Sequence, residues 1–345
     1  MAVLLIGAGN AGSALLDAVC ERGAGKNPRI AINPRVAFEH VRKKEQYVLT
    51  DKGFFRSGGD VVGRRDFKDV SASASAMESY DAALLELLND NIEGVDAAIL
   101  FLGFGGVAGT GISPTIARAL SDLSIPIMVF GTLPSPGGAD TDMRAQYRNV
   151  SYAIEHLKRY TDAFVLMDNQ RIAYTDNIDS MYPRYNQYAA AVVSDILSGS
   201  DPKMSTASSI GVRDVISSIS LPGGGFSAFG RASVLSKDLF HYFIPIGGHK
   251  PIDVQTMIGV AVEKLSINVD TKDAQKSTAL FRVPPWYMKK ENAIDTGSIE
   301  RFQQENSSSG HYLGISLTKR SLVTLTLLLT YTDLPRLREI RDAAQ

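Results

Sequence analysis

Residues 103–111 read Gly-Phe-Gly-Gly-Val-Ala-Gly-Thr-Gly, and the fold of the surrounding chain is inferred from this stretch. An apolar run at 97–102 precedes it, and an apolar-periodic segment at 116–123 follows it. This order predicts a buried strand, a glycine turn and a helix. Because glycine has no Cβ, backbone N–H groups at such a turn can converge on an anion, most often a phosphate. The alternative is an ordinary strand-to-helix turn with additional glycines.

A second glycine turn follows the apolar strand predicted at 2–6. Gly7-Ala8-Gly9-Asn10-Ala11-Gly12 matches the G-x-G-x-x-G pattern of dinucleotide-binding folds. Those folds carry an acid after the second strand, whereas the strand predicted at 29–32 ends in Asn33-Pro34-Arg35. An NAD-dependent oxidoreductase is therefore a remote alternative. It rests on the first glycines alone and leaves residues 103–111 unexplained.

Strand and helix patterns alternate in the first half of the chain. Apolar strands are predicted at 46–49, 125–130 and 163–167, with helices at about 67–88 and 141–159. This alternation predicts a doubly wound α/β domain with a parallel sheet, whose loops converge at the carboxyl ends of the strands.

The pattern changes after residue 176. Residues 181–197 are apolar over much of a helical surface, which predicts a long buried helix between two domains. Strands predicted at 226–232, 278–283, 311–317 and 322–331, with helices at 213–219 and 254–264, indicate a smaller α+β domain. The Ser-, Asn-, Gln- and Gly-rich segment 291–310 is predicted to be a mobile insertion. We therefore expect a nucleotide-binding domain at 1–176, a connecting helix at 177–200 and a C-terminal domain at 201–345.

Composition excludes several classes of function. The 345 residues carry a net charge of −1, which gives no electrostatic argument for a nucleic-acid partner or a membrane surface. The longest apolar run, at 321–332, is too short to insert into a membrane as a helix. The first strand leaves no room for a signal peptide, so we expect a cytoplasmic protein. The single Cys20 and the five scattered histidines predict no protein-built metal site.

Residues 105–111 resemble the G-G-G-T-G-[ST]-G signature of the tubulin/FtsZ superfamily. Val107 and Ala108 stand where that family has a glycine and a hydroxyl. The order of the other loops extends the resemblance over nearly the whole chain. The first glycine turn, the Asp168-Asn169 pair and the short end of the chain are most similar to the archaeal CetZ branch.

The resemblance implies a guanine-nucleotide site for GTP or GDP with Mg²⁺. Asn169, Tyr182 and Asn186 match positions that contact the base, where an amide can pair with the edge of guanine and an aromatic ring can stack on it. A helix N-cap is the alternative role for Asn186. The other residues implied to contact the nucleotide are Gly7, Gly9, Asn10, Ala11, Gly12, Asn33, Gly58, Gly59, Asp60, Gly103, Gly105, Gly106, Val107, Ala108, Gly109, Thr110, Gly111, Pro134, Gly138 and Arg144.

The family also has a catalytic loop, N-x-D-x-x-D, which reaches the nucleotide of the next subunit. Residues 209–214 match it only in part: Asp214 fits the second acid, Gly211 replaces the first and Ser209 replaces the Asn. The resemblance thus implies that Asp214 orients the attacking water. The alternative is that Asp214 is only an acid in the first turn of a helix.

The function implied is a cytoskeletal GTPase. It would polymerise head to tail with copies of itself into filaments for cell shape or division, and its hydrolysis would depend on assembly. The departures at Val107, Ala108, Gly137 and Gly211 favour an alternative, a scaffold of the same fold that binds nucleotide with little or no hydrolysis.

Overall fold

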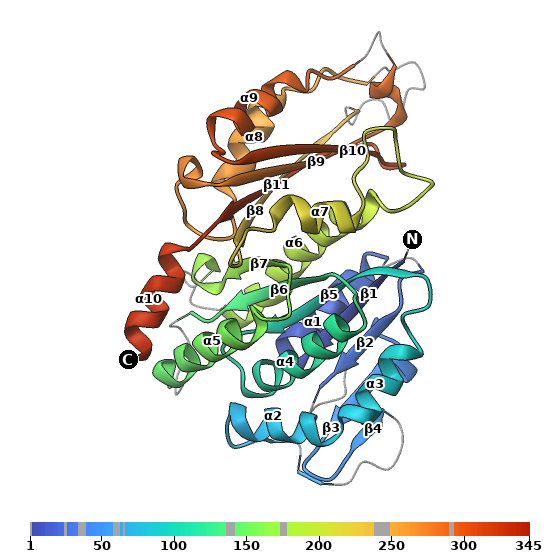
Figure 1. Ribbon diagram of the computed structural model, residues 1–345. Helices are drawn as coiled ribbons and strands as arrows, with labels where there is room; N and C mark the ends of the chain where they lie inside the picture. The colour runs from blue at the N-terminus through green and yellow to red at the C-terminus, as the bar shows by residue number, and fades with distance from the viewer. Residues whose placement is uncertain are drawn as a thin grey trace.

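The computed structural model describes residues 2–23, 26–33, 39–57, 63–64, 66–135, 142–172, 178–237, 249–289 and 293–345. Strands and helices alternate through the first half (Figure 1). The strands are β1 (Ala2–Ala8), β2 (Arg29–Ile32), β3 (Gln46–Leu49), β4 (Phe54–Arg56), β5 (Val95–Gly103), β6 (Ile127–Leu133) and β7 (Ala163–Asp168). The helices are α1 (Gly9–Glu21), α2 (Val70–Ser79), α3 (Asp81–Asn89), α4 (Val107–Asp122) and α5 (Met143–Leu157).

The second half opens with the long helix α6 (Ile178–Ser198). It continues with α7 (Val212–Ile219), β8 (Phe226–Leu235), α8 (Val254–Glu263), β9 (Lys276–Val283), α9 (Gly297–Glu305), β10 (Gly310–Leu317), β11 (Leu322–Tyr331) and α10 (Pro335–Ala344). The predicted doubly wound first domain, central helix and smaller α+β domain are confirmed.

One sheet runs through both domains. Its described strands are ordered β10-β9-β11-β8-β7-β6-β5-β1-β2-β3-β4. The seven strands from β8 to β3 are mutually parallel, and β11 is antiparallel to both of its neighbours. The domains meet at β7 and β8, which share three residue pairs, Phe164 with Phe226, Val165 with Ser227 and Leu166 with Ala228.

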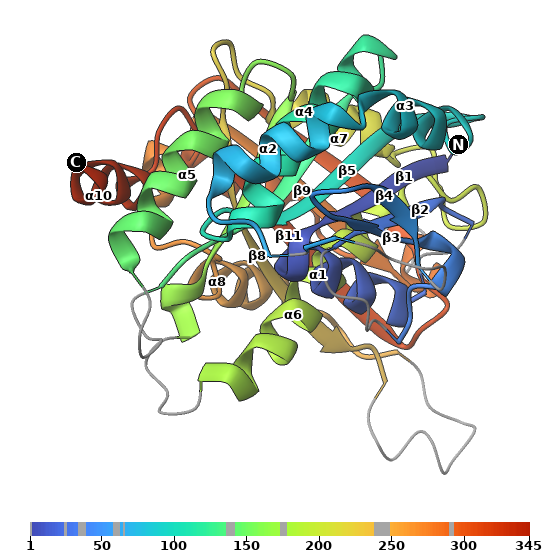
Figure 2. The same cartoon turned by 90° about the horizontal axis from the view of Figure 1, so that it is seen from below.

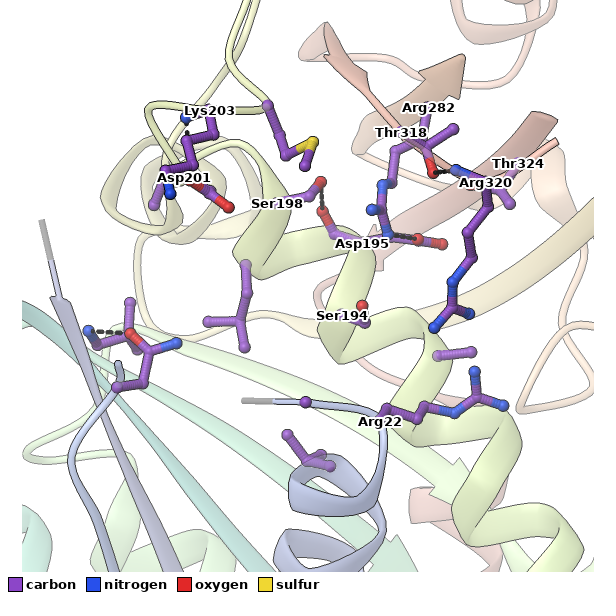
Figure 3. A pocket seen from close by; sticks show the side chains of 18 of the residues that line it. Arg22, Ser194, Asp195, Ser198, Asp201, Lys203, Arg282, Thr318, Arg320 and Thr324 are labelled. Atoms are coloured by element: carbon purple, nitrogen blue, oxygen red, sulfur yellow. Dashed lines mark hydrogen bonds and ion pairs between the residues drawn. The ribbon is translucent and has the colours of Figure 1, made fainter. Parts of the chain in front are cut away.

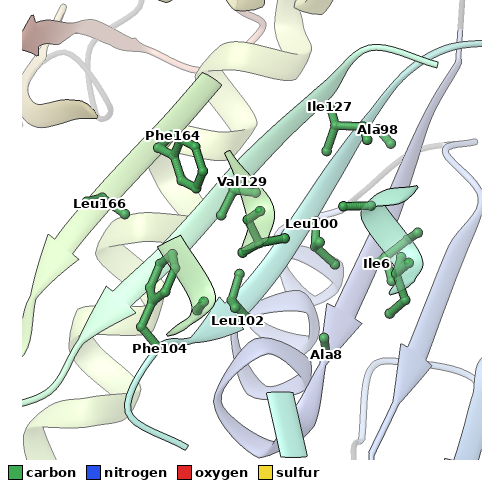
Figure 4. Packing of buried hydrophobic residues seen from close by; sticks show 14 of the residues in the cluster. Ile6, Ala8, Ala98, Leu100, Leu102, Phe104, Ile127, Val129, Phe164 and Leu166 are labelled. Atoms are coloured by element: carbon green, nitrogen blue, oxygen red, sulfur yellow. The ribbon is translucent and has the colours of Figure 1, made fainter. Parts of the chain in front are cut away.

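The central strands are buried on both faces, as parallel strands between two helical layers require. On one face, Ile6, Leu100 and Val129 pack beneath α2 to α5 and α10 (Figure 4). On the other face, Leu5 and Ile99 pack against α1, α6 and α7. Figure 2 shows α2 to α5 on one side of the sheet and α1 and α6 on the other. Side chains of α8 and α9 cover the sheet of the second domain.

Two predicted elements are wrong. The single helix expected at about 67–88 is two helices, because Tyr80 leaves the helical conformation at φ −116° and ψ 25°. The insertion predicted at 291–310 contains α9, whose Ile299 and Gln303 are fully buried. Gln303 Nε2 donates to the carbonyls of Ser277 at 3.0 Å and Tyr312 at 2.9 Å, which accounts for a polar side chain in the core.

Candidate functional site

Two helix N-termini meet at the carboxyl ends of β1 and β5. Gly9, the first residue of α1, has a φ of +70°, and a Cβ added to it would lie 2.6 Å from the nitrogen of Gly109 in α4. A Cβ on Gly109 would lie 2.7 Å from the carbonyl oxygen of Ala8. Side chains at either position would force the two helices apart, so glycine is required at both.

The glycine turns are shorter than the sequence predicts. α1 begins at Gly9 and α4 begins at Val107, so five of the nine residues in 103–111 are helical. Some of its residues serve packing: a Cβ on Gly111 would clash with the Ser73 hydroxyl, and Thr110 Oγ1 donates to the carbonyl of Phe104 at 2.9 Å. Gly12 likewise has no room for a Cβ against the carbonyl of Phe101.

Among the described residues, no side chain caps or neutralises either of these N-termini. The N-cap residues Ala8 and Gly106 make no side-chain cap, and the first turns contain no acid. By contrast, α2, α5 and α8 are capped by aspartates, Asp69, Asp142 and Asp253. The free N–H groups and the dipoles of α1 and α4 therefore favour an anion where the helices meet.

Neighbouring side chains fix the second turn. Asn149 Nδ2 of α5 donates to the carbonyl of Gly105 at 2.9 Å, and the Ser73 hydroxyl of α2 donates to the carbonyl of Val107 at 3.0 Å. Gly106 is exposed at this turn, and Asn10 and Ala11 are exposed at the start of α1. The sequence did not point to Asn149 or Ser73, because nothing local links them to the turn.

The residues expected to bind the base gather at the end of β7. Asn169 follows that strand, and its Oδ1 is buried with no hydrogen-bond partner in the described part of the chain. Tyr182 and Asn186 are half-buried and lie one turn apart on α6, so they share a face. The N-cap alternative for Asn186 is wrong, because α6 begins at Ile178.

Tyr185 joins α6 to the same strand end. Its hydroxyl donates to the carbonyls of Asp168 and Ser266, both at 3.3 Å. Burial raises the pKa of the Tyr185 hydroxyl well above its usual range, so it is a permanent donor here. This contact holds the start of α6 against the Asp168-Asn169 pair.

A third element reaches these strand ends from the C-terminal helix. Arg336 of α10 is buried and donates through Nη2 to the carbonyl of Pro134 at 2.9 Å, just after β6. Its Nε lies 3.3 Å from Asp168 Oδ2, and its guanidinium carbon lies 5.5 Å from the centroid of the Tyr147 ring. Burial raises the pKa of Asp168, and the Gln170 N–H and Arg336 partly oppose that rise. Nothing in the local sequence pointed to Arg336, because its partners lie far away along the chain.

The remaining residues that were predicted to contact the nucleotide lie on several different elements. Gly7 is the residue before the last of β1, Gly103 is the last of β5, and Asn33 is buried directly after β2. Val107 and Ala108 are half-buried in the first turn of α4. Arg144 is exposed on α5 and donates to the carbonyl of Gln345, which directs it toward α10. Gly58, Gly59, Asp60 and Gly138 lie outside the described residues, as does Gly137.

Asp214 lies far from this site. It is exposed in the first turn of α7, where its Oδ2 accepts the Gly211 N–H at 2.9 Å. α6 starts beside the end of β7 and leads back to the edge where β1 begins, since Ala2 and Ser200 line one cavity there. Figure 1 shows α7 toward the N-terminus and α10 on the other side. Asp214 and Gly9 thus lie toward opposite ends of the parallel strands, and the seven residues of β1 span about 20 Å.

The described residues lack two further features. No helix among them combines the length and the apolar character that a bilayer crossing needs. Nor do three His, Cys, Asp or Glu side chains come together there in a way that could hold a metal ion.

Known proteins resemble this chain in sequence and in fold. The model of the Tubulin/FtsZ family, GTPase domain, matches residues 2–176. The chain is 27% identical over 173 residues to cell division protein FtsZ 1 of Pyrococcus woesei, a match that covers 49% of this chain and 43% of that protein. The chain spans about half the length of the curated relatives that it matches.

Two solved structures from Haloferax volcanii have the same fold. CetZ1, a GDP-bound monomer, superposes with a TM-score of 0.76 at 20% identity and covers 100% of this chain and 98% of that one. CetZ2, a GTPγS-bound protofilament, superposes with a TM-score of 0.74 at 22% identity and covers 99% and 98%. With the family match over residues 2–176, these findings show that the chain belongs to the tubulin/FtsZ family.

Proposed function

We propose that this protein binds GTP and GDP where α1 and α4 meet, and that it hydrolyses GTP when its copies assemble head to tail. The observation that carries the proposal is the pair of uncapped helix N-termini that begin at Gly9 and Val107, on the same sheet edge as Asn169 Oδ1, which has no partner among the described residues. The first feature suits phosphates, and the second suits an N–H group of a base.

The roles of the residues follow from their positions. The N–H groups at 9–12 and 105–111 would bind the phosphates, with Gly7 and Gly103 leaving room for the turns. Asn169 and Asn186 would pair with guanine, and Tyr182 would stack on it. Asn33, Pro134 and Arg144 would complete the site. CetZ1 with GDP and CetZ2 with GTPγS support a guanine nucleotide in this fold.

The position of Asp214 supports catalysis between copies. It lies at the other edge of the parallel strands, so in one copy it cannot reach the phosphates that α1 and α4 would hold. Head-to-tail stacking would bring that edge onto the nucleotide of the next copy, and contacts that do not close into a ring give filaments. The CetZ2 protofilament is a precedent for such stacking.

Hydrolysis would then depend on positioning and electrostatics. The backbone N–H groups would stabilise the charge that develops on the transferred phosphoryl group, and Asp214 of the neighbouring copy would orient the water for in-line attack. Mg²⁺ would supply further neutralisation of the phosphates. The first turns of α1 and α4 offer it no acid, so its ligands would be mainly phosphate and water.

We propose a cytoplasmic filament that acts in cell shape or division, with α6 connecting a nucleotide domain at 1–176 to a C-terminal domain at 201–345. A nucleotide-binding scaffold without hydrolysis remains the second candidate, because Gly211 supplies no acid beside Asp214. An NAD-dependent oxidoreductase is not retained, since the family match includes the turn on which it rested.

The test is to identify the nucleotide that co-purifies and to follow phosphate release against protein concentration. We expect guanine nucleotide and a specific activity that rises with concentration. Asp214→Asn keeps an oxygen for the Gly211 N–H but removes the charge, so nucleotide binding should be unchanged while hydrolysis falls at least about tenfold. Hydrolysis at the wild-type rate would remove Asp214 from the mechanism. Bound guanine nucleotide without hydrolysis in the unmodified protein would favour the scaffold.

A further inference from the structure

A cavity of about 650 Å³ lies between the two domains, away from the candidate nucleotide site (Figure 3). One wall is the start of β1 and the end of α1, and another is the last two turns of α6. The second-domain sheet closes it with Arg231 of β8, Arg282 of β9 and Thr324 of β11. The cavity therefore opens at the strand edge on which Asp214 lies, not at the edge of Gly9.

The lining of the cavity is strongly basic, although the chain as a whole carries a net charge of −1. Among the described residues that line it, six side chains are cationic and two are acidic, Asp195 and Asp201, which leaves an excess of four positive charges. The cationic residues are Arg22, Lys26, Lys203, Arg231, Arg282 and Arg320.

Asp195 already has its partners. It is buried on α6, with Oδ2 at 2.6 Å from Arg231 Nε and Oδ1 at 2.8 Å from Arg282 Nη1. Thr326 Oγ1 also donates to its Oδ2, at 2.8 Å. Asp195 is thus already shared between two guanidinium groups, and among the described residues it forms no ion pair with the other cations of the lining.

Those remaining cations are Arg22, Lys26, Lys203 and Arg320. Within the described part of the chain none of them has a carboxylate oxygen within 4.0 Å. Arg22 Nε donates instead to the amide oxygen of Gln187, at 3.0 Å. Figure 3 shows the side chains of Arg22 and Arg320 extending into the same space.

Two other polar atoms of the lining residues lack partners. Arg282 Nε and Thr324 Oγ1 are buried without a hydrogen bond among the described residues. Burial and the nearby guanidinium groups of Arg231 and Arg320 lower the pKa of Arg22. Burial and like-charged neighbours thus disfavour the charged form of Arg22, and a bound anion would favour it.

We propose that this cavity is a second ligand site, which binds a small polyanion built of several linked phosphate groups. Guanidinium groups bind phosphate oxygens in pairs, and four unneutralised cations spread over the walls call for several anionic groups in one ligand. The volume lies within the usual range of small-molecule sites, about 300–1,000 Å³, and exceeds what one inorganic ion fills.

A hydrogen bond connects the lining of the cavity to α7. Ser200 lines the cavity, and its Oγ accepts the N–H of Val212, the first residue of α7, at 3.0 Å. Lys203 and Met204 belong to the same connecting segment. A ligand that draws Lys203 inward would shift the segment that leads to α7 and hence Asp214. This effect on hydrolysis rests on the proposed function, whereas binding itself does not.

The test is a calorimetric titration of the full-length protein with inorganic tripolyphosphate, in excess GDP and at constant ionic strength. We expect one tripolyphosphate per chain, no displacement by GDP, and binding at least about tenfold tighter than that of sulfate. Arg22→Gln with Arg320→Gln should weaken binding about a hundredfold, roughly tenfold for each guanidinium removed. The matched control is Arg301→Gln with Arg338→Gln, an equal change in charge at exposed residues outside the cavity.

The proposal is overturned if tripolyphosphate does not bind, if GDP displaces it, if sulfate binds as tightly, or if both double variants bind alike. Circular dichroism checks that the variants fold. Arg320→Gln alone, at an exposed position, gives the same test should the double variant unfold. The cavity variants leave the candidate nucleotide site unchanged. They therefore test this proposal even if the protein binds no GDP.

Discussion

Replacing Arg336 by methionine tests whether α10 stabilises the ends of β6 and β7. Methionine keeps an apolar stem beside Tyr147 but removes the guanidinium, which is 3.3 Å from Asp168 Oδ2 and 2.9 Å from the carbonyl oxygen of Pro134. The side chains of Arg336 and Asp168 are only 7% and 6% exposed, so the remaining carboxylate would be buried without its cation. Removing one partner of such a pair costs about 3–5 kcal/mol.

That loss is large against a typical total stability of about 5–15 kcal/mol. Urea unfolding followed by far-ultraviolet circular dichroism should show it. GDP binding should weaken as well, because Asp168 directly precedes Asn169. Glu339→Gln is the matched control: Glu339 lies 3.2 Å from the same guanidinium but is 63% exposed, so its loss should cost less than about 1 kcal/mol.

A double variant completes the test. Asp168→Asn with Arg336→Met removes both charges and should be more stable than Arg336→Met alone, because no unpaired charge remains buried. The reasoning is refuted if Arg336→Met loses less than about 1 kcal/mol, or if the double variant is no more stable than the single one. Either result would mean that water reaches the Asp168 carboxylate.

The raised pKa of Asp168 also predicts that the unfolding free energy depends on pH. Burial raises its pKa in the folded protein, so the folded state still binds a proton when the unfolded chain has released it. The unfolding free energy should therefore fall as pH rises from the ordinary aspartate value, 3.8, through the raised folded value. Asp168→Asn should remove this slope, which urea titrations at several pH values would measure. An unchanged slope in Asp168→Asn would mean that another titratable group causes the pH dependence.

Other substitutions test features elsewhere in the protein. Gly9→Ala should abolish nucleotide binding, measured by fluorescent-nucleotide titration, because the added Cβ would lie 2.6 Å from the Gly109 nitrogen at a φ of +70°. Asp195→Ala should lower stability by about 3–5 kcal/mol in urea, because it leaves two guanidinium groups without their carboxylate. The hydrogen bond to Asp17 raises the pKa of His40, so its stabilising effect is complete below 6.5 and is lost as pH rises through the folded value. An NMR titration should return the His40 pKa to its ordinary value in Asp17→Asn.

The strands of the first domain were predictable because each is an unbroken apolar run. That pattern follows from burial on both faces, as at 97–102 within β5. α9 was not predictable from its polar composition: Gln303 is stabilised in the core by the carbonyls of Ser277 and Tyr312, and such partners are invisible in a local window. Nor does periodicity reveal that β7 pairs with β8, which makes one sheet of two domains.

The sequence predicted the chemical type of the candidate site, but not the role of each residue in it. Glycine spacing indicated an anion site, yet it could not separate Gly9, where two helices meet, from Gly111, which makes room for Ser73. The part played by α10 was hidden, because Arg336 contacts Asp168 across half the chain. Long-range pairs of this kind leave no trace in residue order.

The narrow junction between the domains has a mechanical consequence. β7 and β8 share three residue pairs, whereas β6 and β7 share six and β8 and β11 share ten. Between β5 and β11, a pulling force applied across the two domains meets the fewest residue pairs at this line, which the Phe164 and Phe226 rings reinforce with centroids 5.4 Å apart. Under tension the sheet should part there first, while the 21 residues of α6 keep the two halves tethered and able to rejoin.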